Sequence, residues 1–221
     1  GSSNVSSAAN VMAVPSAGVA VPATLTLRVS AIRYAAHETV LLDLERADGE
    51  PLPACEPGAH VTLHLPNGLV RQYSLVEHGA APHRYVVGVK RDAASRGGSR
   101  YIHDQLRVGT MLPVEPPRNN FPLDEAAPHT VLVAGGIGIT PLYCMARRLR
   151  ALGRPFELHY AVRTRDDVAF ARELAGWPEL RLHVDAEAAR VLHVAAVVAA
   201  APANAALYCC GPGPMLAAFE A

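Results

Sequence analysis

The sequence is poor in the features that mark a nucleic-acid or membrane partner. Its 20 basic residues, of which Lys90 is the only lysine, are balanced by 20 acidic residues, so the formal net charge is zero. This balance offers no general electrostatic basis for binding nucleic acid or an anionic membrane. The apolar run at residues 191–206 is interrupted by His193, Pro202 and Asn204 and is too short to span a bilayer. We therefore expect neither kind of partner.

Cysteine is scarce, and its spacing excludes the usual metal sites. None of the four cysteines stands in the C-x₂-C arrangement of zinc sites or in the spacing of iron–sulfur ligands. Reduced thiols in a cytoplasmic protein are the interpretation that we prefer. The charged start of a signal peptide is also missing, because no basic residue precedes Arg28. The cysteines are Cys55, Cys144, Cys209 and Cys210.

Histidine does not supply a metal site either. His60 and His64 share one face of a predicted strand, which is a geometry that two metal ligands could use. No third ligand stands at a recognisable spacing from them. We therefore predict no metal site in this chain and assign these histidines to ordinary surface or core positions.

The first half of the chain divides into a tail and a β-rich domain. Residues 1–21 are rich in Ser, Ala and Val without a period, and we predict a tail that is disordered or was added to the natural chain by cloning. Residues 22–122 contain short aliphatic and β-branched runs with period two, which predict an antiparallel six-stranded β-barrel. Asn67 and Gly68 predict a two-residue hairpin turn, and the prolines of residues 116–122 predict a linker. The strands are expected at residues 24–29, 39–45, 60–65, 69–76, 84–90 and 111–114, and a helix at 99–106.

Residues 128–221 form the second predicted domain. Strand-like and helix-like runs alternate here, which predicts a Rossmann-like parallel sheet with right-handed crossovers. The ligands of such sheets bind beyond the carboxyl ends of the strands. Strands are expected at residues 131–134, 156–162, 180–184 and 206–210, and helices at 141–152, 167–174, about 191–200 and 214–221.

Residues 131–141 are the most informative stretch, because they predict a buried strand, a glycine turn and a capped helix. Thr140 is the expected N-cap and Pro141 the first helical residue. Such a helix start directs free N–H groups and a positive dipole end toward a phosphate. The spacing Gly136-x-Gly138-x-x-Pro141 departs from the dinucleotide fingerprint G-x-G-x-x-G and lacks the P-loop lysine. A tight connection that needs glycine for geometry alone is therefore the alternative.

The β-rich half holds a second candidate anion site. Residues 95–99, Ser-Arg-Gly-Gly-Ser, open a predicted helix with free amides and a hydroxyl. On a nearby predicted strand, Arg71 and Tyr73 face one way and Gln72 and Ser74 the other. A guanidinium beside an aromatic ring would suit a flat heterocycle with a phosphate tail. The simpler interpretation is a surface arginine and a tyrosine at a barrel end.

Four motifs taken together decide between these interpretations. In order and spacing they resemble the ferredoxin reductase-like flavoproteins, most closely the phthalate dioxygenase reductase and vanillate demethylase reductase group. The resemblance covers nearly all of residues 22–221. It implies FMN on the barrel, a nicotinamide nucleotide on the α/β domain and hydride transfer where they meet. The motifs are Arg71-x-Tyr73-Ser74-Leu75, residues 95–99, residues 135–141 and Cys210-Gly211-Pro212.

The resemblance also implies which residues form the site. Ser74 would approach flavin N5 and Cys210 would sit by nicotinamide C4, and these two are the predicted catalytic residues. For Cys210, a small buried apolar residue is the alternative, and a nucleophilic role is not expected. On the flavin side the implied binding residues are Arg71, Gln72, Tyr73, Ser74, Lys90, Gly97, Gly98 and Ser99. On the nicotinamide side they are Gly135, Gly136, Gly138, Thr140, Arg163, Cys210, Gly211 and Pro212.

The identity of the coenzyme depends on a few charged residues. The acidic residue expected at the end of the second α/β strand, which would bind ribose, is replaced by Arg163. An arginine would suit the 2′-phosphate of NADPH, but Asp166 and Asp167 follow within four residues. The resemblance favours NADH. We interpret the two aspartates as a loop and a helix N-cap and not as an acid–base pair.

The resemblance further implies the reductase component of a Rieske-type oxygenase system. Its electron acceptor would be a [2Fe–2S] centre, which the cysteines of this chain cannot build. We expect that centre in a C-terminal domain absent from this chain or in a separate ferredoxin, with a terminal oxygenase as the further partner. We expect a cytoplasmic monomer. The alternatives are an FAD-dependent ferredoxin–NADP reductase relative, a non-catalytic flavin- or nucleotide-binding sensor and a nicotinamide dehydrogenase without flavin.

Overall fold

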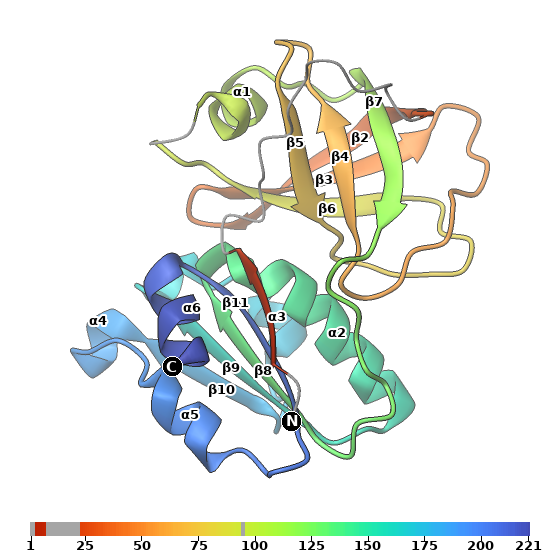
Figure 1. The fold of residues 1–221 in the computed structure, drawn as a ribbon. Coiled ribbons are helices and arrows are strands. Elements are labelled where there is room, and N and C mark those ends of the chain that lie inside the picture. The colour runs from red at the N-terminus through yellow and green to blue at the C-terminus, as the bar shows by residue number, and fades with distance from the viewer. Residues whose placement is uncertain (1–2, 8–22, 94–95) are drawn as a thin grey trace.

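A computed structural model describes residues 3–7, 23–93 and 96–221 of the chain. In these residues a six-stranded antiparallel sheet precedes a five-stranded parallel sheet covered by helices on both faces (Figure 1). The predicted fold class, a β-barrel followed by a Rossmann-like α/β domain, is therefore confirmed.

The antiparallel sheet has the strand order β5-β4-β7-β2-β3-β6. An isolated bridge between Leu75 and Val87 links the two ends of this order and closes the sheet into a barrel. Inward-facing residues such as Leu27, Val61 and Val87 are fully buried, as the period of two requires. The elements are β2 (Leu25–Ala36), β3 (Thr39–Arg46), β4 (His60–His64), β5 (Val70–Ser74), β6 (Tyr85–Lys90), β7 (Met111–Arg118) and the helix α1 (Gly98–Asp104).

The hairpin between β4 and β5 forms where it was predicted, although its loop is longer. The amide of Gly68 donates to the Leu65 carbonyl (2.9 Å), and the amide of Leu65 donates to the Leu69 carbonyl (2.8 Å). Gly68 has a positive φ of 85°, which glycine adopts without steric cost. The loop therefore contains three residues, with Pro66 and Asn67 at its turn, and the predicted two-residue loop is wrong.

The prolines after Val114 extend a strand, although they were predicted to form a linker. β7 includes Pro116 and Pro117 and continues pairing with β4 as far as Arg118. Its other neighbour, β2, pairs only with residues 111–114 of β7. The proline positions therefore lie on a segment with one open side, where a missing N–H is tolerated.

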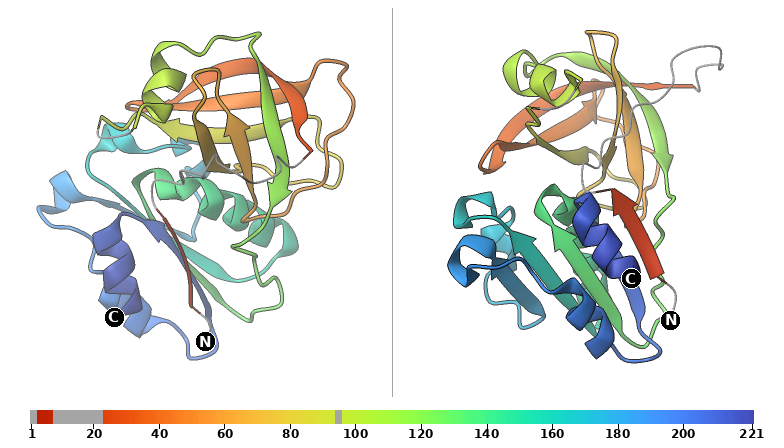
Figure 2. Two further views of the ribbon diagram at one scale, coloured as in Figure 1. Left: turned by 45° about the horizontal axis from the view of Figure 1, so that its top comes forward. Right: turned by 60° about the vertical axis from the view of Figure 1, so that its left-hand side comes forward.

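The parallel sheet has the order β1-β11-β8-β9-β10. Helices cover both faces of this sheet (Figure 2). Alternate residues of β8 face these two layers: Leu132 packs in the cluster that contains α2, whereas Val131 and Val133 pack with α5 and α6. The strands are β8 (Thr130–Gly135), β9 (Phe156–Val162), β10 (Leu180–Val184) and β11 (Ala206–Gly211). The helices are η1 (Gly136–Gly138), α2 (Ile139–Leu152), η2 (Arg165–Asp167), α3 (Ala171–Leu174), α4 (Asp185–Ala188), α5 (Val194–Ala200) and α6 (Gly213–Glu220).

The N-terminal tail contains a strand that was not predicted. β1 (Ser3–Ser7) pairs in parallel with β11, from Ser3 opposite Leu207 to Ser7 opposite Gly211. A serine-rich segment carries no apolar period, so its pairing, which depends on backbone hydrogen bonds, left no signal in the sequence. The prediction of an unstructured tail is therefore wrong for residues 3–7. For residues 8–22 it lies outside the described part of the chain.

The acidic turn after β9 also differs from its prediction. Thr164 is the N-cap of η2, and the Asp167 carboxylate accepts hydrogen bonds from the amide (3.1 Å) and the hydroxyl (2.9 Å) of Thr164. Asp167 is thus the third helical residue of a capping box and not the N-cap. The predicted helix 167–174 is reduced to α3, and α4 was not predicted.

A shared apolar interface joins the two domains. Leu41 and Val86 of the barrel belong to the same buried cluster as Leu142 of α2. A Cβ placed on Gly88 of β6 would lie 2.7 Å from the Thr140 methyl group, so the barrel backbone approaches α2 closely. The amide of His37 also donates across the interface to the Asp166 carbonyl (2.8 Å).

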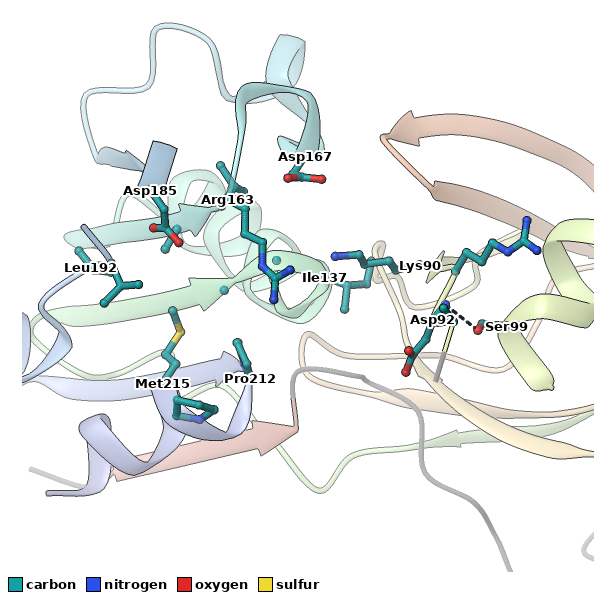
Figure 3. A pocket seen from close by; sticks show the side chains of 18 of the residues that line it. Lys90, Asp92, Ser99, Ile137, Arg163, Asp167, Asp185, Leu192, Pro212 and Met215 are labelled. Atoms are coloured by element: carbon teal, nitrogen blue, oxygen red, sulfur yellow. Dashed lines mark hydrogen bonds between the residues drawn. The ribbon is translucent and has the colours of Figure 1, made fainter. Parts of the chain in front are cut away.

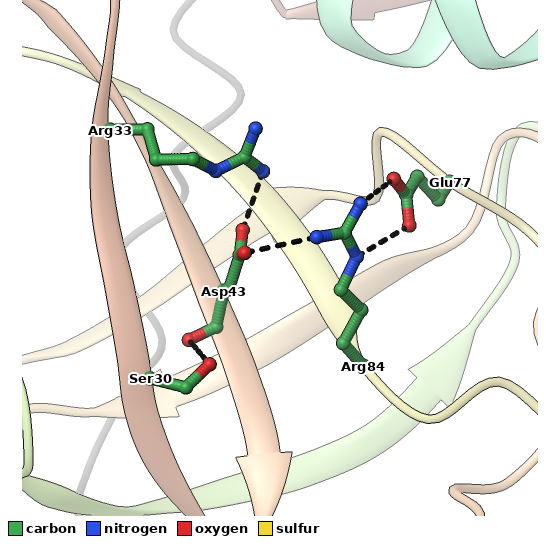
Figure 4. Close-up of polar contacts among 5 residues, drawn as sticks. All are labelled: Ser30, Arg33, Asp43, Glu77 and Arg84. Carbon is green, nitrogen blue, oxygen red and sulfur yellow. Dashed lines mark hydrogen bonds and ion pairs between the residues drawn. The ribbon is translucent and has the colours of Figure 1, made fainter.

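A charged network connects barrel residues beside this interface (Figure 4). The Asp43 carboxylate, which belongs to a residue only 5% exposed, pairs with Arg33 (2.6 Å) and with Arg84 (3.1 Å). Arg84 also pairs in a bidentate manner with Glu77 (2.6 and 3.1 Å). Two guanidinium groups thus balance the buried charge of Asp43.

Candidate cofactor-binding site

A cavity of about 730 Å³ lies where the two domains meet (Figure 3). Its volume falls within the range of roughly 300–1,000 Å³ that is usual for cofactor and ligand sites. Residues of the barrel form one wall, namely Arg71, Lys90, Arg91, Asp92, Ala93, Arg96 and Ser99. The other wall follows the carboxyl ends of β8, β9, β10 and β11 and includes Gly135, Gly136, Ile137, Ala161, Val162, Arg163, Asp167, Asp185, Leu192, Pro212 and Met215.

On the barrel wall, β5 places Arg71 against the start of α1. Only 7% of Arg71 is exposed, and its Nη1 donates to the Val70 carbonyl (2.9 Å). A Cβ on Gly98 would lie 2.7 Å from Arg71 Nε, so glycine at this position allows the guanidinium stem to lie close to the helix. The Ser99 hydroxyl accepts a hydrogen bond from the Asp92 amide (3.0 Å) and holds the loop that completes this wall. Ser95 of the predicted motif lies outside the described residues.

The cavity carries cations that are not neutralised by carboxylates. Arg91 pairs with Asp104 (3.1 Å). Among the described residues, by contrast, no carboxylate lies within ion-pair distance of Arg71, Lys90, Arg96 or Arg163. A nearly buried guanidinium such as that of Arg71 needs an anionic partner to offset its desolvation. The barrel wall is therefore suited to a phosphate group.

On the α/β wall, glycines allow three segments to meet. A Cβ on Gly135 would lie 2.7 Å from the Met215 side chain, and one on Gly211 would also collide with Met215. A Cβ on Gly138 would overlap the Cys210 carbonyl oxygen. Gly136 has a positive φ of 55° and lines the cavity. For Gly138 the structure thus supports the purely geometric interpretation of the glycine turn.

The helix after this turn begins earlier than predicted. The 3-10 turn η1 continues directly into α2, so Gly138 is the N-cap and Thr140 lies within the first turn. Thr140 is 1% exposed, and its hydroxyl donates to the Ile137 carbonyl (3.4 Å). The prediction of Thr140 as N-cap and Pro141 as first helical residue is wrong, because the glycines are themselves helical. The predicted end at Gly153 is confirmed, with a φ of 67°.

The structure brings together only part of the predicted set of site residues. The predicted residues that line the cavity are Arg71, Lys90, Ser99, Gly135, Gly136, Arg163 and Pro212. The predicted residues that do not line it are Gln72, Tyr73, Ser74, Gly97, Gly98, Gly138, Thr140, Cys210 and Gly211. Some residues of the second group pack behind the cavity wall. Gly98 lies against the Arg71 side chain, and Gly138 lies against the Cys210 carbonyl.

Tyr73, Ser74 and Cys210, to which the flavoprotein resemblance gives the ring-facing positions, are all buried. Tyr73 packs in the barrel core with 1% exposure, and burial raises the pKa of its phenol well above the ordinary value. Ser74 is 7% exposed at the end of β5. Cys210 is fully buried in the core that contains α2, which matches the alternative of a small apolar residue. In this structure none of the three forms the cavity wall.

Several cavity residues had no motif to reveal them. Asp92, Leu192 and Met215 reach the cavity through loop and helix packing that single-sequence patterns do not encode. Asp185 is different, because it ends residues 182–185, which also resemble the flavoprotein group, and because it directly follows the predicted strand 180–184 and so stands at a carboxyl end. The resemblance and that position were the available signals for it.

Other kinds of site find little support in the described residues. No group of three or more His, Cys, Asp and Glu side chains is placed to hold a metal ion there. His64 instead pairs with Glu115 (2.9 Å). No helix in the described part of the chain is long and apolar enough to cross a membrane.

Comparison with known proteins identifies relatives of both domains. The oxidoreductase NAD-binding domain family matches residues 132–221. The phenoxybenzoate dioxygenase subunit beta of Ectopseudomonas oleovorans is 50% identical over 200 residues, which are 90% of this chain and 63% of that protein. A vanillate O-demethylase oxidoreductase of a Pseudomonas species is 46% identical over 189 residues, covering 84% of this chain and 60% of that protein.

The fold has a close counterpart among solved structures. Phthalate dioxygenase reductase, described as a modular structure for electron transfer from pyridine nucleotides to [2Fe–2S], superposes with a TM-score of 0.83 at 37% identity. The match covers 89% of this chain and 63% of that one. The chain thus spans less than two thirds of the length of these relatives. Residues 132–221 thus match the oxidoreductase NAD-binding domain family, and the chain is similar in sequence and fold to the phthalate dioxygenase reductase and vanillate O-demethylase reductase group that its four motifs resemble.

Proposed function

We propose that this chain is the reductase module of an oxygenase system, taking hydride from NADH onto FMN and passing single electrons to a [2Fe–2S] acceptor. The observation that carries this proposal is the cavity of about 730 Å³ whose walls come from both domains. Barrel cations that lack carboxylate partners form one side, and the ends of four parallel strands form the other. Two cofactors bound to opposite walls would therefore face each other. We take residues 22–122 and 128–221 as the two binding domains.

The donor set on the barrel wall fits a flavin phosphate. Arg71 and Arg96 supply charge, and Ser99 lines the same wall, where its hydroxyl accepts a hydrogen bond from the Asp92 amide. Charge-assisted hydrogen bonds from guanidinium groups to phosphate are among the stronger contacts in proteins. The resemblance to the phthalate dioxygenase reductase and vanillate demethylase reductase group favours FMN over FAD. In this view Lys90, which extends into the cavity from the end of β6, completes the charged wall.

The opposite wall fits a dinucleotide. Gly135 and Gly136 leave backbone accessible at the end of β8, and Arg163 projects into the cavity from the end of β9 (Figure 3). Apolar side chains such as Ile137 and Met215 limit the access of water to this region. When bound, the two cofactors supply the hydride chemistry, and the protein supplies binding, orientation and exclusion of solvent. No residue has to move a proton for this step.

An anaerobic spectral titration tests the proposal. Purified chain is incubated with FMN, freed of excess flavin and titrated with NADH while the visible flavin bands are recorded. We expect the protein to retain yellow colour and to bleach on addition of NADH. Flavin that stays oxidised would indicate a non-catalytic sensor, and protein that binds neither FMN nor FAD would contradict the proposal. A parallel incubation with FAD distinguishes the FAD-dependent alternative.

The acceptor requires a separate experiment. The reduced chain is mixed with a plant-type [2Fe–2S] ferredoxin, and the loss of the ferredoxin absorbance on reduction is followed. We expect reduction that depends on both NADH and the chain. A rate no faster than that with free FMN and NADH would contradict the assignment of a [2Fe–2S] domain or ferredoxin, and with it a terminal oxygenase, as partners.

A further inference from the structure

Lys90 carries the only side-chain amine of the chain, because the other Lys and Arg residues are all arginine. It ends β6, where its backbone pairs with Thr39, and its exposed side chain extends into the cavity beside Ile137 (Figure 3). In the described part of the chain, no carboxylate lies within ion-pair distance of its ammonium group. Reactions that are specific to lysine side chains are therefore confined to the cavity between the two domains.

The wall that carries Lys90 is suited to a small molecule that bears a phosphate. Arg71 lines this wall although only 7% of the residue is exposed, and Arg96 lines it from the exposed chain before α1. Two residues after Lys90, the Asp92 amide donates to the Ser99 hydroxyl of α1 (3.0 Å), and the stem of Arg71 packs against the same helix. The backbone thus holds the amine and the arginines on one wall, and guanidinium groups bind phosphate through charge-assisted hydrogen bonds.

The charge of this wall distinguishes between reagents that attack amines. A concave site lined by cations raises the local concentration of anions, by about 10- to 1,000-fold in favourable cases. An uncharged acylating reagent gains nothing from this field. An acyl phosphate, by contrast, combines an anion that arginines can hold with an acyl carbon that an amine can attack. The groups that such a reagent needs lie together on the wall of Arg71, Lys90 and Arg96.

We propose that Lys90 is a site of covalent acylation by small acyl phosphates, such as acetyl phosphate, which Arg71 and Arg96 hold in the cavity. The uncharged form of the amine attacks the acyl carbon, so that a nitrogen–carbon bond forms and the carbon–oxygen bond to phosphate breaks. Inorganic phosphate leaves with the electron pair of the broken bond, and the proton that the amine loses passes to water. The product is an amide at Lys90 without positive charge, and the step needs no oxidant or reductant.

Peptide mass spectrometry tests the inference on the purified chain. Protein free of flavin is treated in mildly alkaline buffer with acetyl phosphate or with the uncharged N-hydroxysuccinimide ester of acetic acid. The acetylated fraction of Lys90 is divided by that of the α-amine of the same protein, which serves as the internal reference. We expect this ratio to be at least about tenfold higher with acetyl phosphate than with the ester. Added inorganic phosphate should lower the ratio only with acetyl phosphate, and equal ratios for the two reagents would overturn the inference.

Substitutions of the arginines test which groups hold the phosphate. Arg71→Ala should lower the ratio for acetyl phosphate by about tenfold, which corresponds to one charge-assisted hydrogen bond. Arg96→Ala should also lower it, and because Arg96 is exposed this variant keeps the test decisive if Arg71→Ala does not fold. Lys90→Arg removes the amine and should abolish the acetylated peptide.

Arg100→Ala is the matched control for the arginine variants. It removes a guanidinium from the same helix start, but Arg100 is exposed and does not line the cavity. Its ratio should stay within about twofold of the wild type, because salt screens exposed charges at a distance. An equal fall in Arg100→Ala and Arg96→Ala would show a general charge effect and overturn the inference. Melting temperatures of all variants establish which of them keep the fold.

Competition with FMN links the modification to the flavin wall, and this part alone rests on the proposed function. The FMN phosphate and acetyl phosphate would bind the same arginines, so bound FMN should slow the acetylation of Lys90 at least about tenfold. FMN that binds and leaves this rate unchanged would overturn the inference. A chain that binds no FMN would contradict the proposed function alone, since the ratios for the two reagents would still decide whether Lys90 is the site.

Discussion

Gly138 packs so closely against the carbonyl oxygen of Cys210 that a side-chain carbon at position 138 would overlap it. This contact joins η1 to the end of β11 beneath the cavity wall. Its neighbour Gly136 instead faces the cavity, with open space where a Cβ would be. The two glycines of one motif therefore serve different purposes, one for packing and one for access of a ligand.

Gly138→Ala should be among the most damaging single changes in the α/β domain. The added methyl group meets backbone that cannot rotate away, and we expect a loss of about 3 kcal/mol in the free energy of unfolding. Gly213→Ala, at the start of α6 with nothing within 4 Å of its Cβ, is the matched control. It should be neutral or slightly stabilising, by up to about 1 kcal/mol. Urea unfolding measures the stability of both variants. Equal midpoints would contradict the assignment of Gly138 to a close backbone contact.

Arg71→Ala should weaken FMN binding more than any change on the outer face of α1. The loss of a charge-assisted hydrogen bond in a nearly buried position corresponds to about 1.5–3 kcal/mol, or about 10- to 150-fold in Kd. Arg100→Ala is the control, because Arg100 lies on α1 but is exposed and does not line the cavity. Quenching of flavin fluorescence measures both affinities. A similar Kd for the two variants would remove Arg71 from the phosphate site.

The sequence was sufficient for the order and type of most elements but not for their ends. The six barrel strands follow from period-two patterns that keep residues such as Leu27 and Val61 inside. By contrast, β1 is stabilised by pairing with β11, and nothing in Ser3–Ser7 indicates a partner about 200 residues away. Local patterns encode which face is apolar, whereas pairing at a sheet edge depends on the tertiary fold.

The candidate site, too, could be predicted from the sequence only in part. The position of Arg163 on the cavity wall follows from its place directly after β9, because topology brings the carboxyl ends of parallel strands together. Tyr73 shows the limit of this reasoning. Alternation places Tyr73 and Arg71 on the same face of β5, but Tyr73 is buried in the barrel core, whereas Arg71 lines the cavity. Which part of a strand face is covered depends on strands far apart in the sequence.

The buried thiol of Cys55 should make stability fall at alkaline pH. Burial, together with the charge of Glu77, raises its pKa from 9.0 to about 11, although a hydrogen bond with Gly79 opposes the shift. The unfolded thiol therefore ionises first, so the stabilising contribution is complete below about pH 9 and is lost as the pH rises toward 11. Between pH 8 and 10, the wild type should lose about 1 kcal/mol more than Cys55→Ala.

Urea titrations of both proteins at several pH values provide the measurement for Cys55. Other groups with raised pKa values, such as Cys209, are present in both proteins and cancel in the difference. Below pH 8 the two stabilities should run parallel. Parallel curves up to pH 11 would show that the Cys55 thiol ionises equally in the folded and unfolded states.

The contact between Gly88 and Thr140 predicts coupling across the domain interface. Gly88→Ala would place a methyl group 2.7 Å from the buried Thr140 methyl, and overpacking of this kind costs about 1–3 kcal/mol. Thr140→Ser removes that methyl and keeps the hydroxyl that donates to the Ile137 carbonyl. In a double-mutant cycle the combined variant should be more stable than the sum of the single losses predicts, by about 1 kcal/mol or more. Gly79→Ala, whose Cβ would meet only an ordinary contact at 3.6 Å, should show no coupling with Thr140→Ser.

The contact between Gly88 and Thr140 also sets the approach of one cavity wall to the other. Gly88→Ala should therefore slow flavin reduction by NADH, and the added Thr140→Ser should restore the rate. Additive free energies and an unchanged reduction rate would mean that the two walls are positioned by other contacts.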